Sequence, residues 1–302
     1  MRKLSEKEII TITECYKNAP PVLYAQLLKF RETCKIKTFE FNEKTVEYIA
    51  TGHGEKTLVM FHGALGSADT TFSEILRLQD RYRIISPTIQ DFGSLDEISD
   101  AVNEILRREH IDRILVRGGS FGAFIAQSYF RRSYKKIDRM VLNNAIPPKG
   151  KYSNKDKRYI KLFKFFFRII SEKLAKKFMF NELSKLGGHS QQLSEEQQQE
   201  LDFLMMQVQE RIAKVRKKHI VESMMLVVEF DLNETMKSED FTDWNGKILL
   251  ITDVEDRSYK YFEKLKAQFP NPQVKIFEKA GHIMQLVYKS EFEEIHDKFL
   301  AN

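Results

Sequence analysis

A chain of 302 residues is long enough for two domains, or for one large domain with an insertion. Apolar residues make up 42% of the chain and charged residues 30%, which excludes collagen-like, low-complexity disordered and rod-like coiled-coil proteins. The sequence has no run of about 18 apolar residues, and its N-terminus lacks the apolar segment of a secretory signal. Two cysteines are too few for a disulfide scaffold, so we expect a protein of the reduced cytoplasmic compartment.

The positive charge is concentrated in one segment. The whole chain carries a formal charge of +6. Between Pro148 and His189, twelve lysines and arginines face three acidic residues, so this segment carries +9 and the remainder −3. The chain is therefore not evenly basic, and any role of the charge belongs to this segment.

The predicted elements alternate between strands and helices along most of the chain. Residues 1–34 are expected to form one or two amphipathic helices, and a hairpin follows over 36–50. We expect further strands at 57–63, 82–88, 113–119, 139–145, 247–253 and 273–278, and helices at 94–108, 121–134, 259–269 and 291–300. This alternation predicts an α/β fold with a mostly parallel, doubly wound sheet covered on both faces.

The alternation breaks once, over residues 147–241, where the pattern is helical. We therefore expect a helical cap at 147–241, inserted into an α/β core formed by 36–146 and 242–302. Residues 1–35 would form an N-terminal helical extension of this core.

The sharpest chemical signal is a G-x-S-x-G motif centred on Ser120, between a predicted strand and a predicted helix. A serine on such a tight turn lies in strained backbone, and Gly118, Gly122 and Ala123 relieve the crowding around it. The turn lifts the hydroxyl clear of the sheet at a helix N-terminus, where developing negative charge is stabilised. We interpret Ser120 as a nucleophile rather than as part of a packed glycine loop.

A nucleophilic serine needs a base, and the base needs an orienting carboxylate. His282 follows the last predicted strand and is expected at the same sheet edge as Ser120. Five other histidines lie in predicted turns or on helix surfaces and are expected to be solvated: His53, His110, His189, His219 and His296. Asp256 follows strand 247–253 and is preferred as the acid over Asp253, which would instead cap the turn.

The oxyanion hole needs two backbone donors. One is the N–H of Phe121, directly after the nucleophile, and Ala64 in the loop after strand 57–63 is our choice for the other. We find no Cys/His cluster with metal-ligand spacing, no P-loop and no G-x-G-x-x-G motif, so neither a metal nor a cofactor is expected.

These pieces together resemble the α/β-hydrolase superfamily, specifically its members with a helical cap, from about residue 36 onwards. The matching motifs are His62-Gly63-Ala64, Gly118-Gly119-Ser120-Phe121-Gly122, Asp256-Arg257 and Gly281-His282. The resemblance implies Ser120 as nucleophile, His282 as base, Asp256 as acid, and a cap over the pocket. Segments 72–86 and 121–130 are also similar, more weakly, to the maspardin-like branch.

The cap sequence allows three interpretations. A broad apolar face (Leu162, Phe163, Phe166, Phe167, Ile170, Leu174) opposes a basic one, which favours a helix packed on the core with a solvated basic side. The surplus apolar surface could instead line an acyl pocket, for which the predicted residues are Leu65, Phe163, Phe167 and Met225. A third interpretation is contact of residues 149–185 with an anionic membrane. Binding of nucleic acid is disfavoured because the aromatic side chains lie on the apolar face and do not alternate with the charged ones.

The sequence therefore supports two functions. The first is a serine hydrolase of small to medium, largely apolar carboxylic esters or thioesters, acting through a Ser-His-Asp triad. The second is a binding or adaptor protein on the same fold with little or no turnover. It is motivated by the basic cap and by two departures from the family that the chain resembles. Asp253 stands where a glycine usually precedes the acid, and Gly119 stands before the nucleophile where many relatives carry histidine or another side chain.

Overall fold

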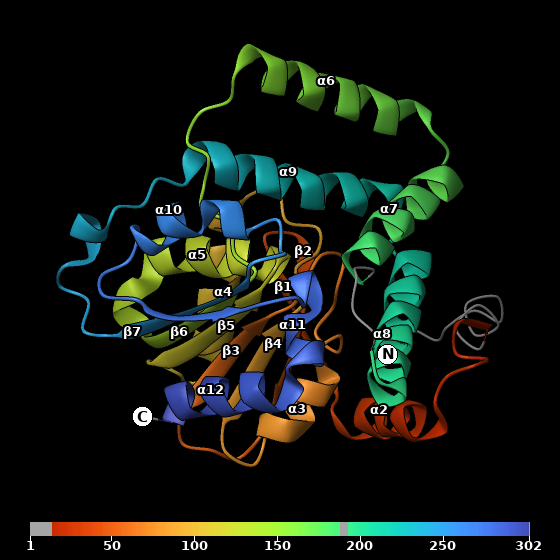
Figure 1. Cartoon of the computed structure of the whole chain (residues 1–302), viewed down its shortest axis with the longest axis horizontal. Helices are drawn as coiled ribbons and strands as arrows, with labels where there is room; N and C mark the ends of the chain where they lie inside the picture. Colours follow the sequence, from red (N-terminus) through yellow and green to blue (C-terminus); the bar gives the residue numbers. More distant parts are fainter. Residues whose placement is uncertain (1–13, 188–192, 302) are drawn as a thin grey trace.

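The computed structural model describes residues 14–187 and 193–301 and has an α/β architecture (Figure 1). The expected helix over residues 1–13 lies outside the described residues. The eight strands are β1 (Ile36–Phe41), β2 (Lys44–Thr51), β3 (Thr57–Phe61), β4 (Arg83–Pro87), β5 (Ile114–Gly119), β6 (Ile137–Asn143), β7 (Lys247–Asp253) and β8 (Gln273–Phe277). They form one sheet in the order β1-β2-β4-β3-β5-β6-β7-β8, in which β2 pairs antiparallel with both β1 and β4 and the other pairs are parallel.

Helices cover both faces of the sheet, as predicted. One face carries α4 (Leu95–Arg108), α5 (Phe121–Ser133) and α10 (Phe262–Lys266). The other carries α2 (Pro21–Thr33), α3 (Phe72–Leu78), α11 (Met284–Val287) and α12 (Lys289–Ala301). The doubly wound, mostly parallel fold expected from the sequence is confirmed.

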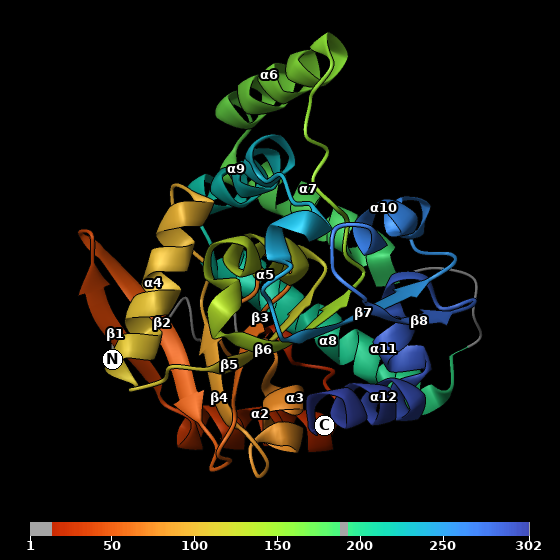
Figure 2. The ribbon, with the colours of Figure 1, turned by 90° about the vertical axis from the view of Figure 1, so that its left-hand side faces the viewer.

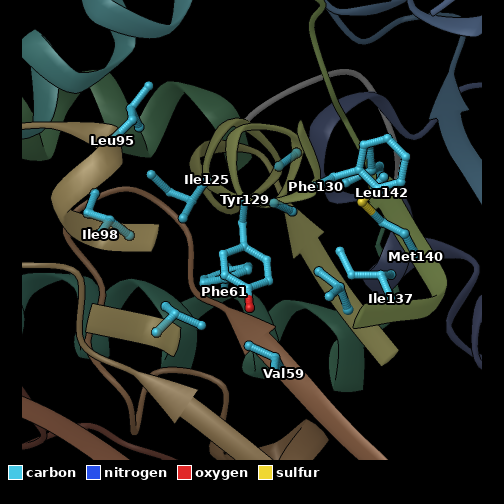
Figure 3. Close-up of a cluster of buried hydrophobic side chains, with 14 of the residues drawn as sticks. Val59, Phe61, Leu95, Ile98, Ile125, Tyr129, Phe130, Ile137, Met140 and Leu142 are labelled. Atoms are coloured by element: carbon cyan, nitrogen blue, oxygen red, sulfur yellow. The ribbon is translucent and has the colours of Figure 1, made fainter. Parts of the chain in front are cut away.

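The core between the sheet and α4 and α5 is filled by large apolar side chains (Figure 3). Phe61 of β3 and Tyr129 of α5 meet there with ring centroids 6.1 Å apart. Both side chains are fully buried, as are most residues of β3 and β5. This packing fixes the positions of β5 and α5 relative to each other, and hence the position of the turn between them.

Local signals set the ends of several elements. Ser94 caps α4, because its hydroxyl accepts a hydrogen bond from the N–H of Glu97. Asn42 and Glu43 both have positive φ angles, of 48° and 62°, as the two central residues of a two-residue hairpin require. The predicted helix at 259–269 is shorter than expected and begins as a 3-10 turn, Tyr259–Tyr261.

In the described residues between β6 and β7, the segment expected to form the cap, the structure has four α-helices. They are α6 (Asn154–Ile169), α7 (Glu172–Gly187), α8 (Glu195–Lys214) and α9 (Lys217–Asn233). Each long helical stretch of the sequence is thus divided in two, because Ile170 and Val215 adopt extended backbone with ψ of 150°. The division into domains at residues 35, 146 and 241 stays a prediction.

Helix α6 departs from the favoured expectation for the cap. Figures 1 and 2 show it at the edge of the molecule, on the far side of α9 from the sheet. Of the sixteen residues of α6, all of which the structure describes, Phe167 alone is buried. The expectation that Leu162, Phe166 and Leu174 pack on the core is wrong, since all three are exposed.

The described helices include none with the length and apolarity to cross a bilayer.

Candidate active site

Ser120 occupies a strained turn between β5 and α5. Its φ and ψ angles are 53° and −120°, a region that residues with a side chain rarely adopt. A Cβ atom at Gly122 would lie 2.3 Å from the carbonyl oxygen of Phe61, and one at Gly118 would lie 2.4 Å from that of Gly122. Both positions therefore require glycine, which is the physical reason for the G-x-S-x-G pattern.

The turns after β7 and β8 bring Asp256 and His282 together. The distance from Nδ1 of His282 to Oδ2 of Asp256 is 2.6 Å, and the Asp256 side chain is 2% exposed. The other carboxylate oxygen of Asp256 accepts a hydrogen bond of 2.7 Å from the N–H of Ser258. With Nδ1 donating to the carboxylate, Nε2 of His282 is the ring nitrogen that can accept a proton.

The environment of Asp256 keeps its carboxylate ionised. Burial acts to raise its pKa, but the hydrogen bond and charge of His282 and the Ser258 contact outweigh burial and lower the pKa to about 2. A permanently charged partner of this kind stabilises an imidazolium when the histidine accepts a proton.

The structure distinguishes the two candidate acids. Asp253 faces its own turn, where its carboxylate accepts hydrogen bonds from the N–H groups of Glu255, at 2.8 Å, and Ala280, at 2.9 Å. It therefore ties the turn after β7 to the segment before His282, the capping role considered for it above. Asp256, and not Asp253, lies against His282.

Asn144, at the end of β6, is part of this cluster and was missed by sequence reasoning. Its Nδ2 lies 3.1 Å from Oδ2 of Asp256, 3.0 Å from Nδ1 of His282 and 3.1 Å from the carbonyl oxygen of His282. Because Nδ1 of His282 already donates to Asp256, the two amide hydrogens of Asn144 go to the carboxylate and the carbonyl. The strand-end pair Asn143-Asn144 was the available signal, and the positive φ of Asn144, 50°, shows its special backbone.

The predicted oxyanion donors come from α5 and from the loop after β3. Phe121 is the first residue of α5, where no helical carbonyl can accept its N–H. Ala64 lines the same cavity as Ser120 and His282, in the loop after β3. Their function as oxyanion donors stays a prediction.

The cavity beside Ser120 has a volume of about 1180 Å³. It lies between the end of the sheet and helices α2, α3, α7, α8, α11 and α12. Its apolar lining includes Leu183, Leu186, Phe203, Met205, Val208 and Leu286. Ser120 and His282 both line it, but within the described residues no hydrogen bond joins the serine hydroxyl to the imidazole. Such contacts are often long in ligand-free enzymes and tighten when substrate binds.

The cavity lining also includes charged residues, which the sequence did not suggest. Arg117, on β5, forms an ion pair of 3.0 Å with Glu74 of α3, and its Nη2 donates to Gln285 at 3.2 Å. The Arg117 side chain is 8% exposed, so its charge is compensated inside the protein rather than by solvent.

The four predicted pocket residues lie elsewhere. Leu65, in the loop after β3, and Phe167 of α6 are buried in a separate apolar cluster whose other buried members come from the cap, and Phe163 packs against it. Met225, on α9, is half-buried. None of the four is among the residues that line the cavity beside Ser120.

Two histidines expected in solvent are held by the protein instead. His296 is fully buried in α12, where its Nδ1 lies 3.2 Å from Asp297. Nε2 of His219 lies 2.7 Å from Asp91, and with Glu222 these residues could offer three metal ligands within 4.8 Å. Lys218 lies within 4.0 Å of the carboxylates of both Asp91 and Glu222, so a cation of the protein already offsets part of the negative charge of this surface cluster.

Comparison with known proteins places this geometry in a family. The family model described as alpha/beta hydrolase fold matches residues 56–287. The chain belongs to the alpha/beta hydrolase fold family. Among curated proteins, none matches the sequence significantly.

Solved structures share this fold at low identity. The carboxylesterase CesB (YbfK) of Bacillus subtilis is 13% identical with a TM-score of 0.68, covering 97% of this chain and 98% of that one. The naproxen esterase of the same organism is 14% identical with a TM-score of 0.65, covering 99% of each chain. A meta-cleavage product hydrolase of Pseudomonas fluorescens is 19% identical with a TM-score of 0.64, covering 88% of this chain and 98% of that one.

Proposed function

We propose that this protein is a serine hydrolase that cleaves a carboxylic ester or thioester through an acyl-enzyme. Ser120 is the nucleophile, His282 the general base and Asp256 the acid that orients the histidine. The observation that carries the proposal is the 2.6 Å contact between His282 and a buried, ionised Asp256. His282 lines the same cavity as Ser120. The esterases among the structural neighbours agree with this choice of reaction.

In the proposed reaction, Oγ of Ser120 attacks the acyl carbonyl while Nε2 of His282 takes the hydroxyl proton. The N–H groups of Ala64 and Phe121 stabilise the oxyanion of the tetrahedral intermediate. Collapse of this intermediate expels the alcohol or thiol, which receives the proton from His282. Water then attacks the acyl-serine with the same base, and the carboxylic acid leaves.

The cavity supports a medium-length, largely apolar acyl group. Its volume exceeds the usual range for small-molecule pockets, and α7, α8 and α11 contribute leucine, methionine and valine side chains to it. The compensated charge of Arg117 gives no net attraction for a charged acyl chain.

Cys15 and Cys34 are both free thiols, which agrees with the cytoplasmic location that we propose.

Turnover of p-nitrophenyl esters and matching acyl thioesters of graded chain length tests the proposal. We expect hydrolysis by the full chain, and a loss of about three decades or more in kcat for Ser120→Ala and for His282→Ala. The matched control is His53→Ala, an exposed histidine that should leave kcat unchanged. Ester hydrolysis that survives Ser120→Ala, or no hydrolysis by the folded protein, would favour the binding-protein alternative.

A further inference from the structure

Helix α6 exposes a row of large apolar side chains to solvent. Tyr159, Leu162, Phe166 and Ile169 recur at spacings of three and four residues, so they share one side of the helix, and Phe165 borders them. Each is between 44% and 64% exposed. Monomeric soluble proteins rarely leave so many large apolar residues side by side in water.

The exposed apolar surface continues onto α7. Leu174 and Phe178, one helical turn apart, are 56% and 41% exposed. The Phe178 ring lies 6.4 Å from that of Phe166, so the two helices form one continuous surface. We call this surface the cap ridge; it comprises Tyr159, Leu162, Phe165, Phe166, Ile169, Leu174 and Phe178.

Basic residues border the cap ridge. Residues 149–169 contain eight lysines and arginines and one aspartate, a net charge of +7. Lys157, Lys161, Lys164 and Arg168 are exposed, and Lys161 and Arg168 flank Phe165 of the ridge at helical spacings of four and three residues. In the described part of the chain, no carboxylate lies within ion-pair distance of these four, whereas the single aspartate is paired with Lys149.

The charge decides which partner fits the cap ridge. A second copy of this chain, related by a two-fold axis, would bring two segments of +7 face to face, and their repulsion opposes the apolar contact. An anionic bilayer takes both features at once, because the apolar side chains enter the interface while the lysines and arginines meet the lipid phosphates. We propose that the cap ridge is a docking surface for an anionic lipid membrane.

The position of α7 relates this surface to the cavity. Leu174 and Phe178 belong to the cap ridge, whereas Leu183 and Leu186 of the same helix line the cavity with Ser120. A membrane bound at the cap ridge would therefore contact the helix that forms one wall of the cavity. The docking itself does not depend on the proposed hydrolysis.

Flotation of the full chain with vesicles tests the proposal. The probes are vesicles of pure phosphatidylcholine and vesicles that also contain phosphatidylserine, at ~0.05 M and ~0.5 M salt. We expect binding to the phosphatidylserine vesicles at low salt, weak binding at high salt, and none to pure phosphatidylcholine. Equal binding to both compositions, or no binding at low salt, would overturn the proposal.

Variants separate the two parts of the surface. The double change Phe165→Ser, Ile169→Ser should weaken partition at least ten-fold, because two apolar side chains no longer enter the interface. Lys161→Gln with Lys164→Gln should weaken it and reduce its salt dependence. The matched controls are Val22→Ser on α2 and Lys298→Gln on α12, both exposed and at the opposite end of the molecule from α6 (Figure 1).

Two further readouts keep the test decisive. Ser120→Ala should bind vesicles as the unchanged chain does, so a failure of the proposed hydrolysis does not affect this result. If the Phe165→Ser, Ile169→Ser variant binds vesicles as strongly as the wild-type protein, the cap ridge is not the docking surface. A dimer in sedimentation that this double variant abolishes, without vesicle binding, would assign the surface to a second copy and also refute the proposal.

Discussion

His62 is a buried imidazole whose protonation state follows from its two contacts. Its Nε2 accepts a hydrogen bond of 2.9 Å from the N–H of Ile89, so the ring proton sits on Nδ1, which donates to the carbonyl of Gly63 at 2.8 Å. The neutral ring thus ties the loop that carries Ala64 to the end of β4. Burial, together with the nearby charge of Arg211, outweighs the Gly63 hydrogen bond and lowers the pKa of His62 to about 4.

This pKa predicts how stability depends on pH. In the unfolded chain His62 titrates near pH 6.5, so between pH 6.5 and 4 the unfolded state binds the extra proton. The stabilisation, about 3 kcal/mol in total, is present above pH 6.5 and is lost as the pH falls towards 4. Urea unfolding at pH 7 and pH 5 should show that wild type loses about 2 kcal/mol more than His62→Gln. Parallel losses in both proteins would contradict this account.

Asn144 is expected to act as a positioning residue for Asp256 and His282. Asn144→Gly removes the amide but keeps the left-handed backbone that glycine tolerates. We expect kcat for ester hydrolysis to fall about ten-fold or more, since a hydrogen bond to a charged group is lost, with KM and the melting temperature little changed. The control is Asn271→Gly, another left-handed asparagine, which should keep full kcat. A loss confined to KM would argue against positioning.

At the scale of elements, Glu210 connects α8 to the N-terminal segment. Its buried carboxylate accepts hydrogen bonds from the Tyr16 hydroxyl at 2.6 Å and from Arg31 of α2 at 2.9 and 3.1 Å. Burial acts to raise the pKa of Glu210, but Arg31 and Lys214 outweigh it and lower the pKa. Because α2 and α8 both line the cavity, this cluster holds two of its walls together.

Loss of Glu210 should therefore destabilise the fold. Glu210→Ala leaves the Tyr16 hydroxyl buried without its partner and leaves Arg31 with Asp69 alone, and we expect the free energy of unfolding to fall by about 2 kcal/mol. Glu291→Ala removes a carboxylate of an exposed pair with Lys275 and should cost at most about 1 kcal/mol. Urea denaturation compares the two variants, and equal effects would show that the Glu210 cluster contributes little.

Most strands and core helices could be predicted because their signals are local. The hairpin at β1 and β2, the Ser94 cap and the apolar run of β3 each depend on neighbouring residues. The fate of α6 could not be predicted in this way. Its periodicity indicates an apolar side, but whether anything covers that side depends on where the rest of the cap lies.

At the scale of the whole molecule, the candidate site depends on three separate strand ends. Parallel strands bring the turns after β5, β7 and β8 to one edge of the sheet, which is why Ser120, Asp256 and His282 could be chosen from the sequence. The cavity lining, the Arg117–Glu74 pair and the contacts of Asn144 could not. They depend on side chains from separate helices and strand ends that meet only through tertiary packing.

The most direct test of the central claim is covalent labelling of the serine. The full chain is incubated with a fluorophosphonate, and the adduct is located by mass spectrometry of peptides. We expect one adduct, on Ser120, that is absent in Ser120→Ala and forms at least a hundred-fold more slowly in His282→Ala. An unlabelled Ser120 in the folded protein, or labelling at the same rate without His282, would contradict the account.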